Sequence, residues 1–290
     1  MNSSYGHVGY QVADNVATLT LTRLGRRNAI SMDLAEDLAR RLEQAAADRA
    51  VRTVVLTGAD RDFCVGADLA ASVDSRFLRL EEPDEDAARL LHGARAVTLL
   101  RSMGKPTVAA IRGGCAGAGM SLALACDLRY ATDTAVFNTA FVAIGLSGDF
   151  GIAWLLNNVV GPARAAELLL LPDKMRARDA LAKGLLTDVY EEDRFDERIA
   201  EVAGRLARSA PLALAGAKDN LRAAISQTIE EYLPAEAARI VRCAYSRDSV
   251  EARAAFVEKR PAEFTATDRR SQSRGHDGKA PPRRGGAFPS

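Results

Sequence analysis

Two short glycine-containing turns, each following a buried strand and leading into a helix, constrain the fold of this 290-residue chain more than any other feature. The first turn, residues 63–69, reads Phe-Cys-Val-Gly-Ala-Asp-Leu and follows an apolar segment at 51–57. The second, residues 113–121, reads Gly-Gly-Cys-Ala-Gly-Ala-Gly-Met-Ser and follows an apolar segment at 106–111. A helix is expected at 118–125. Strands and helices in this alternating order predict an α/β fold.

Backbone N–H groups with no partner in the chain are expected to point outward from both turns. Such groups at the start of a helix, reinforced by the helix dipole, attract anions, and two of them facing one another form an oxyanion hole. A phosphate-binding loop is the other chemical interpretation of the second turn, but no Lys-Ser/Thr pair follows it and its glycine spacing fits the dinucleotide fingerprint poorly. Small residues that let a strand and a helix pack closely explain part of the pattern without any ligand.

Hydrophobic alternation near the N-terminus predicts how the sheet begins. Residues 8–13 and 15–22 alternate apolar and polar side chains around an Asp-Asn pair, which is typical of a hairpin of half-buried strands. Ser31 is expected to cap a helix that ends near Asp48.

The second half of the chain is predominantly helical in its pattern. One helix is predicted over residues 84–103, and a short apolar strand over 185–189. The other helices are predicted at residues 152–160, 162–170, 176–183, 193–208, 211–225, 229–246 and 249–258.

Charge and hydropathy exclude several classes of function. The chain has 39 Lys and Arg residues against 38 Asp and Glu, but residues 265–290 hold six of the basic and two of the acidic ones, so the rest is mildly acidic. We therefore expect no nucleic-acid partner, because such binders usually carry a clustered basic face. The longest uncharged stretch in the middle of the chain, residues 113–126, is too short to span a bilayer. The N-terminus lacks the features of a secretory signal, which favours a cytoplasmic location.

Histidine and cysteine usage narrows the chemistry further. Only His92 lies in the body of the chain, so a metal site of several imidazoles is excluded and a Ser-His-Asp device would have to use that residue. The four cysteines have no Cys-x-x-Cys spacing and are interpreted as reduced packing residues. The acidic run at residues 81–86 is interpreted as a solvated, mobile loop rather than a metal site.

Several motifs together resemble the enoyl-CoA hydratase/isomerase (crotonase) superfamily. They are residues 16–23, 27–29, 63–69, 125–131 and 255–260. The resemblance implies a crotonase-like spiral of strand-strand-helix repeats with a helical C-terminal trimerisation region. It also implies an acyl-CoA thioester substrate, no separate cofactor because coenzyme A is part of that substrate, and assembly as a homotrimer or dimer of trimers.

The resemblance and the composition of the tail together divide the chain into three parts. The spiral core is expected over residues 1–200 and the helical oligomerisation region over 201–264. Residues 265–290 are rich in Ser, Arg, Gly and Pro, and are expected to form a disordered basic tail.

The resemblance also implies roles for individual residues. The N–H groups of Ala67 and Ala118 would hold the thioester oxygen, although family members usually have glycine at the second position. The residues expected to bind coenzyme A are Arg27, Ala29, Asp68 and Leu69 along the channel, with Phe256 and Lys259 of the C-terminal helix closing it.

The reacting side chains point away from standard hydration. The two positions at which family hydratases carry glutamates hold Ser121 and Phe141 here. Asp149 instead matches the aspartate that family isomerases use for proton transfer, so isomerisation is favoured over hydration. In a pocket lined by Phe141, Phe150 and Trp154 this carboxylate would be partly desolvated and more basic. A plain helix cap is the alternative role for Asp149.

Other interpretations stay open on the sequence alone. Atypical hydration or dehalogenation is the alternative reaction, the latter with Asp149 as nucleophile and His92 assisting. For His92 itself, a packed or solvated position on an amphipathic helix is favoured. Ser121 would either hydrogen-bond a substrate or simply fill a small helix position. A non-catalytic acyl-CoA-binding protein is the alternative of another class.

Overall fold

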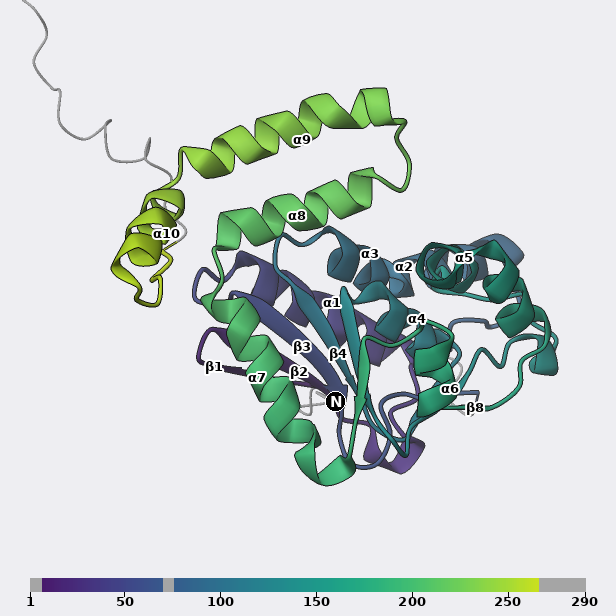
Figure 1. Ribbon diagram of the computed structural model, residues 1–290. Helices are drawn as coiled ribbons and strands as arrows, with labels where there is room; N and C mark the ends of the chain where they lie inside the picture. Colours follow the sequence, from purple (N-terminus) through teal and green to yellow (C-terminus); the bar gives the residue numbers. More distant parts are fainter. Residues whose placement is uncertain (1–6, 70–75, 266–290) are drawn as a thin grey trace, which may run out of the picture.

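The computed structural model describes residues 7–69 and 76–265, and its centre is a six-stranded mixed sheet (Figure 1). Only the first two strands are antiparallel, and all other neighbours are parallel. Across the sheet the strands are β1 (Val8–Ala13), β2 (Val16–Leu21), β3 (Thr53–Gly58), β4 (Thr107–Ile111), β6 (Leu128–Thr132) and β9 (Asp188–Tyr190). The predicted α/β class is therefore confirmed.

The N-terminal hairpin forms where alternation predicts it. Asp14 and Asn15 connect β1 and β2 with φ angles of 50° and 63°. Asp and Asn tolerate this left-handed conformation, which matches the twist of a tight hairpin. Residues of β2 alternate between buried and half-buried, as expected for a strand with one face on the core.

The parallel strands are apolar on both faces because helices cover both sides of the sheet. Val54 and Leu56 of β3 belong to the main core, which lies under α1 (Met32–Ala47). Val55 faces the other way, into a smaller core formed with α7 (Phe195–Arg208). This explains why residues 53–56 read as a continuous buried run, without the alternation of the hairpin.

A second, three-stranded sheet holds the segments that follow the main strands. It consists of β5 (Gly114–Ala116), β7 (Val136–Asn138) and β8 (Met175–Arg176). Residues of the first turn run beside β5, since the Cys64 N–H donates to the Gly114 carbonyl at 3.1 Å and the Ala116 N–H donates to the Cys64 carbonyl at 2.9 Å. The fold thus brings the two glycine turns together.

Helix α4 (Ala118–Ala125) begins directly at the second turn, and all of its residues are buried. Next to it, the single helix predicted over 84–103 is wrong in one respect. The structure has two helices, α2 (Pro83–Gly93) and α3 (Arg95–Ser102), which break at Ala94. A Cβ on Gly93 would lie 2.3 Å from Cε1 of Phe77, so this aromatic ring packs against the helix at the break.

The acidic run is also corrected by the structure. Its second half forms the first turn of α2, where acidic side chains favour the helix dipole. Asp86 accepts hydrogen bonds from the N–H groups of Arg79 at 2.9 Å and Leu80 at 2.8 Å. This part of the run is therefore a helix start with a defined carboxylate, and not a loop.

The C-terminal half is helical, as predicted. Helix α5 (Ile152–Leu170) contains a break at Gly161, whose φ of 76° and ψ of 165° separate the two predicted helices. The later helices are α6 (Ala177–Ala182), α7, α8 (Pro211–Ala223), α9 (Ile229–Ala244) and α10 (Arg247–Glu258). In Figure 1, α8, α9 and α10 form an arm that projects from the sheet, while α7 lies across the sheet face.

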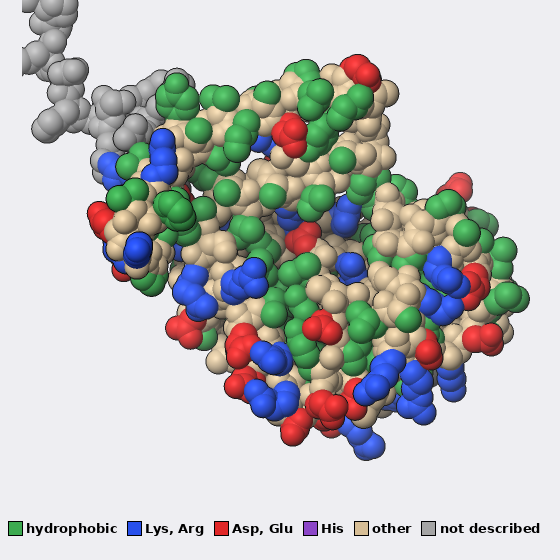
Figure 2. Space-filling model, viewed as in Figure 1, with side chains coloured by type: hydrophobic (Ala, Val, Ile, Leu, Met, Phe, Trp, Pro, Cys, Tyr) green, Lys and Arg blue, Asp and Glu red, His purple; other side chains and the backbone are tan. Residues whose placement is uncertain are grey.

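The arm carries many exposed apolar side chains, which gather over α8 and α9 in Figure 2. They include Leu221, Ile229, Leu233, Ile240 and Val241. The arm is anchored by Lys218, whose ammonium group donates to the Leu100 carbonyl at 2.8 Å and pairs with Asp127 at 2.7 Å. The exposed surface suits the predicted oligomerisation region, which stays a prediction.

Three further expectations concern the chain as a whole. In the described residues, no helix is both long and apolar enough to cross a bilayer. All four cysteines are free; Cys64, Cys115 and Cys126 are buried, as expected for packing residues, whereas Cys243 is half-buried. Apart from residue 265, the predicted disordered tail at 265–290 lies outside the described residues.

Candidate active site

The two glycine turns meet at Gly66 and Gly117. Their φ angles are +99° and +50°, in the region that favours glycine. A Cβ on Gly66 would lie 3.2 Å from the Ala116 carbonyl oxygen, and one on Gly117 would lie 3.5 Å from the Gly66 Cα. The backbones therefore touch, and the next residue in each turn is a predicted donor, Ala67 or Ala118.

Neighbouring bonds fix both donor peptides while leaving the donors themselves unused. Around Ala67, the Gly66 carbonyl accepts from Ile30 N–H at 2.7 Å and Asp68 N–H donates to the Ile30 carbonyl at 2.8 Å. Ala118 is the first residue of α4, where intrahelical partners are lacking. Among the described residues, neither the Ala67 N–H nor the Ala118 N–H donates to another protein group. Two fixed donors on touching turns make a site suited to a developing oxyanion.

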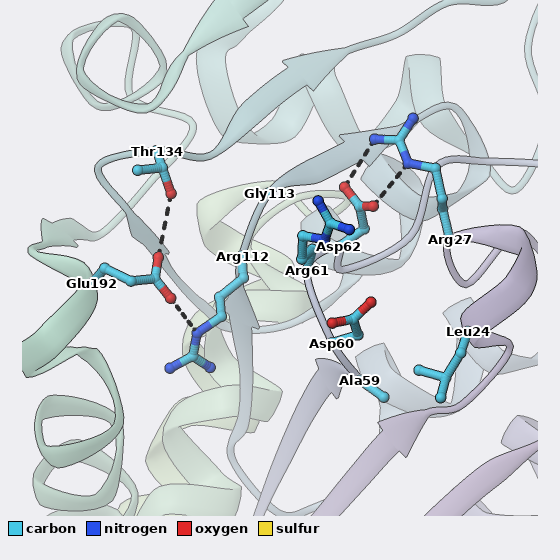
Figure 3. A pocket seen from close by; sticks show the side chains of 10 residues that line it. All are labelled: Leu24, Arg27, Ala59, Asp60, Arg61, Asp62, Arg112, Gly113, Thr134 and Glu192. Carbon is cyan, nitrogen blue, oxygen red and sulfur yellow. Dashed lines mark hydrogen bonds and ion pairs between the residues drawn. The ribbon is translucent and has the colours of Figure 1, made fainter.

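Asp62 links the bases of the two turns. One of its oxygens accepts from Gly114 N–H at 2.6 Å and from Arg27 Nη2 at 2.9 Å, and the other accepts from Arg27 Nε at 2.8 Å. Figure 3 shows the two bonds from Arg27. The Arg27 hydrogen bond is the main reason that the pKa of Asp62 lies below its usual value. Arg27, predicted to bind coenzyme A, is therefore engaged by Asp62, a residue that the sequence reasoning missed.

A pocket of about 680 Å³ opens beside this link, where the loops after the parallel strands converge (Figure 3). Arg27 and Asp62 lie on one side of it, and Arg112 on the other side pairs with Glu192 at 2.8 Å. Arg61 also lines the pocket. Ala67, Ala118 and Asp149 do not line this pocket. The pocket therefore lies beside the candidate site and is not part of it.

Asp149 lies on a tightly curved loop at the start of α5. Gly148, Phe150 and Gly151 have φ angles of 129°, 49° and 75°, a concentration of unusual backbone conformations typical of functional sites. The Ser121 hydroxyl on α4 donates to the Asp149 main-chain carbonyl at 3.3 Å. The loop is thereby attached to the helix that starts at the second turn.

The Asp149 carboxylate is partly desolvated. Its Oδ1 atom is buried without a hydrogen-bond partner, and burial raises the pKa of Asp149 to about 6. Asp149 does not cap α5, because the N-cap residue of that helix is Gly151 and no side chain accepts a capping hydrogen bond there. The alternative role as a helix cap is therefore wrong. A carboxylate with a raised pKa, on a loop attached to the helix that begins at the second turn, can exchange protons with a bound ligand.

Two of the three predicted pocket aromatics lie at the site. The would-be Cβ of Gly117 is 3.8 Å from Cζ of Phe141, which is buried. Phe150, also buried, packs edge-on against Phe77 with ring centroids 5.5 Å apart. Phe77, which the sequence did not single out, is therefore a neighbour of the Asp149 loop.

Trp154 does not line the pocket with these rings. It is 50% exposed on α5, and the Arg101 guanidinium lies 5.3 Å from its ring centroid. Its helical neighbours Ile152 and Leu155 are the buried ones, so Trp154 is on the other face of α5. The prediction of an acyl-pocket wall is corrected here.

Two of the predicted coenzyme A contacts are held by Arg23. This guanidinium donates to the Ala29 carbonyl at 2.7 Å and to an Asp68 carboxylate oxygen at 2.8 Å. The Asp68 side chain is only 5% exposed, so its carboxylate supports the first turn from inside. Leu69, by contrast, is largely exposed next to it.

Three predicted residues are not brought to the site by this chain. His92 is half-exposed on α2, with Nε2 3.5 Å from a Glu36 oxygen, as its solvated interpretation expects. Phe256, 85% exposed, and Lys259 belong to the end of α10 in the arm. The segment after α10 contacts Arg52, which precedes β3, at the opposite end of that strand from the turns.

Comparison with known proteins assigns the chain to a family. The family model described as enoyl-CoA hydratase/isomerase matches residues 11–267. A probable enoyl-CoA hydratase of Rhodobacter capsulatus is 34% identical over 263 residues, which are 90% of this chain and 99% of the relative. A 4-chlorobenzoyl coenzyme A dehalogenase of Arthrobacter is 32% identical, covering 83% of this chain and 86% of the relative.

A further relative is named as an isomerase, and a similar solved structure is again named as a hydratase. A 1,2-epoxyphenylacetyl-CoA isomerase of Escherichia coli is 33% identical, covering 88% of this chain and 96% of the relative. The crystal structure of a putative enoyl-CoA hydratase of Streptomyces coelicolor superposes with a TM-score of 0.85 at 34% identity, covering 92% of this chain and 97% of that one. By its sequence and its fold, the chain belongs to the enoyl-CoA hydratase/isomerase family.

Proposed function

We propose that the protein is an acyl-CoA isomerase, in which Asp149 moves a proton between carbons of a thioester whose oxygen is held by the Ala67 and Ala118 N–H groups. The observation that carries the proposal is the Asp149 carboxylate, with its buried oxygen lacking a hydrogen-bond partner and its pKa raised to about 6. Such a carboxylate is still ionised at neutral pH and more basic than an exposed one.

The proposed reaction begins with polarisation of the thioester carbonyl. Two N–H donors bound to the oxygen stabilise the negative charge that develops when a C–H bond next to the carbonyl, or conjugated with it, is broken. One such donor is worth about 3 kcal/mol in the transition state. Because peptide donors on fixed turns need no reorganisation, they suit this role without any charged side chain.

Asp149 then handles the proton. Its carboxylate takes the proton from one carbon, the electron pair of that C–H bond passes into the enolate, and the same carboxyl group returns the proton to another carbon of the conjugated system. The substrate is rearranged without gain or loss of atoms. A single carboxyl group is sufficient for this sequence, in agreement with the absence of a second carboxylate from the positions of Ser121 and Phe141.

Hydration is less well supported by the same positions. Adding water to a conjugated double bond needs one group to activate the water and one to protonate carbon. Ser121 is fully buried and donates to a main-chain carbonyl, and Phe141 has no ionisable group. Dehalogenation assisted by His92 is disfavoured because that side chain lies beside Glu36 on the surface.

Assembly is part of the proposal. We expect a homotrimer or dimer of trimers, supported by the exposed apolar side chains of the arm. Because α10 lies far from the turns of its own chain, Phe256 and Lys259 would close the coenzyme A channel of a neighbouring copy.

Deuterium exchange tests the proposed reaction. The purified protein is incubated in deuterated water with a panel of enoyl- and aryl-CoA thioesters, and label on carbon is followed by NMR. We expect exchange and double-bond movement with at least one unsaturated thioester, and their loss in Asp149→Asn but not in the control Asp193→Asn, which alters an exposed carboxylate. Unchanged turnover by Asp149→Asn would exclude the proposed role.

Other outcomes of the same experiment identify the alternatives. Heavy-oxygen label in Asp149 after turnover in labelled water would indicate a covalent ester intermediate and replace isomerisation by hydrolytic substitution. Binding of thioesters without any exchange would indicate a non-catalytic acyl-CoA-binding protein.

A further inference from the structure

A small cavity lies where α3, α4, α5 and α8 converge, at the end of α4 away from the turns. Its volume is about 260 Å³. The charged and polar side chains that line it are Arg101, Asp127, Arg129, Asn158, Lys218 and Arg222. Four of these six side chains are cations, so the charge of the lining is unusually one-sided.

Two of the cations are neutralised within the chain. Lys218 pairs with Asp127 at 2.7 Å, and Arg222 pairs with Asp219 at 3.0 Å on the same helix. The other two, Arg101 and Arg129, have no carboxylate partner among residues 7–69 and 76–265. The excess positive charge at the cavity is therefore that of these two guanidinium groups.

Arg129 is held in place by neutral acceptors. Its Nε donates to the Leu185 carbonyl at 2.7 Å and its Nη1 donates to the Cys126 carbonyl at 2.7 Å. These bonds fix the orientation of the planar group without compensating its charge. Burial lowers the pKa of Arg129, and the nearby charge of Arg101 acts in the same direction, whereas the nearby Asp127 carboxylate acts against it.

Arg101 faces the cavity from α3 with its guanidinium over the Trp154 ring. Its Nε atom is buried and has no hydrogen-bond partner. Leaving a buried donor of a charged group unpaired is costly, and native proteins rarely do so without a ligand, ion or water at that point. Arg101 therefore offers an unused donor next to Arg129, a second cation that no carboxylate in the described residues pairs with directly.

We infer that this cavity binds a small oxyanion, a phosphate or carboxylate group, between the guanidinium groups of Arg101 and Arg129. Planar guanidinium groups bind both kinds of oxyanion through charge-assisted hydrogen bonds. Because Lys218 and Arg222 on α8 line the same cavity, a bound anion would also stabilise the position of the arm on the core. The inference does not depend on the reaction proposed above.

Titration calorimetry of the full-length protein with inorganic phosphate, and separately with succinate, tests this inference at constant ionic strength set by chloride. We expect saturable binding of at least one of the two probes, which also distinguishes a phosphate from a carboxylate site. Arg101→Gln should weaken the binding at least about tenfold, as expected for the loss of one charge-assisted hydrogen bond.

Arg95→Gln is the matched control, because Arg95 lies on the same helix but pairs with Glu43 at the surface. It should bind the probe as the unaltered protein does. Arg101→Lys keeps the positive charge but loses the planar group that can donate two parallel hydrogen bonds, so it should retain part of the affinity. Absence of binding by the unaltered protein, or equal affinity in Arg101→Gln, would overturn the inference.

Discussion

The carboxylate of Asp62 accepts the Gly114 N–H at 2.6 Å, and this bond ties the start of the second glycine turn to the start of the first. Close by, the Phe63 N–H donates to the Arg112 carbonyl at 2.8 Å. The approach requires glycine, since a Cβ on Gly114 would lie 2.8 Å from the Asp62 oxygen. We therefore expect the position of the Ala118 N–H relative to the Ala67 N–H to depend on the Asp62 carboxylate, although Asp62 belongs to neither donor peptide.

Replacing Asp62 by alanine tests this dependence. The change leaves the Gly114 N–H without its acceptor and releases Arg27, so we expect a loss of about 1–3 kcal/mol in the free energy of unfolding. Displacement of the second turn should lower kcat by about tenfold or more. Urea unfolding and the deuterium-exchange rate measure the two effects. Asp60→Asn, at an exposed neighbour whose left-handed backbone Asn also adopts, is the control, and an unchanged kcat in Asp62→Ala would contradict the argument.

The activity should depend on the ionisation of Asp149. Its pKa is raised to about 6 by burial, and the proposed base must be ionised to accept a proton. We therefore expect kcat/KM to fall as the pH drops through about 6 and to be constant above it, up to the next ionisation. A rate profile over acid and neutral pH checks this. If kcat/KM instead falls only near pH 4, the pKa of an exposed aspartate, the carboxylate is not desolvated in the site.

The same pKa predicts a stability effect of the opposite sign to that of most carboxylates. The folded protein holds the Asp149 proton up to a pH of about 6, whereas the unfolded chain releases it near 3.8. The folded state therefore loses stability as the pH rises between these values, by up to roughly 3 kcal/mol.

Asp149→Asn should accordingly be more stable than the unaltered protein at neutral pH, and the difference should vanish near pH 4. Thermal unfolding of the two proteins across this range measures it. A difference that does not change with pH would mean that the carboxyl group is not desolvated in the folded state.

Features that depend on neighbouring residues in the chain could be predicted from the sequence. Features that depend on contacts between residues far apart in the sequence could not. The two turns could be predicted because glycines and small residues between an apolar strand and a helix form a pattern that is visible within a few residues of the sequence. Asp149 was predicted from its match to the aspartate of the family isomerases, and its catalytic role stays a prediction. Asp62 bonds to Arg27, which is 35 positions away in the sequence, and to Gly114, which is 52 positions away. No local sequence pattern indicates contacts over such separations.

Trp154 and the arm show the same limit. Residues 152–160 are apolar on most sides, so periodicity could not indicate which face of α5 is buried. Phe77, which lies sixteen residues before Gly93, packs its ring against that glycine next to the break at Ala94, and no local pattern indicates this contact. Phe256 and Lys259 carry a family motif, but their distance from the turns follows from the path of α8, α9 and α10, which only the structure gives.

Gly117→Ala should impair catalysis more than folding. Gly117 has φ 50° and ψ −128°, a conformation that costs an L side chain about 1–3 kcal/mol. The peptide that carries the Ala118 donor would rotate to relieve this strain, and kcat should fall by about a hundredfold, the effect of losing one oxyanion donor. Gly25→Ala is the control, because a Cβ there meets no atom within 4 Å. An active Gly117→Ala protein would argue against Ala118 as a donor.

A charge placed on the arm should prevent assembly without unfolding the core. Ile240 is 65% exposed on α9, among the apolar side chains that we expect to face a neighbouring copy. Burying a lysine there without a partner would cost more than the contact gains, so Ile240→Lys should sediment as a monomer. If α10 of a neighbour closes the coenzyme A channel, this monomer should also show a raised KM for the thioester with a near-normal circular dichroism spectrum. Glu230→Lys, which changes a charge already at the surface of α9, is the control, and an intact oligomer in Ile240→Lys would place the interface elsewhere.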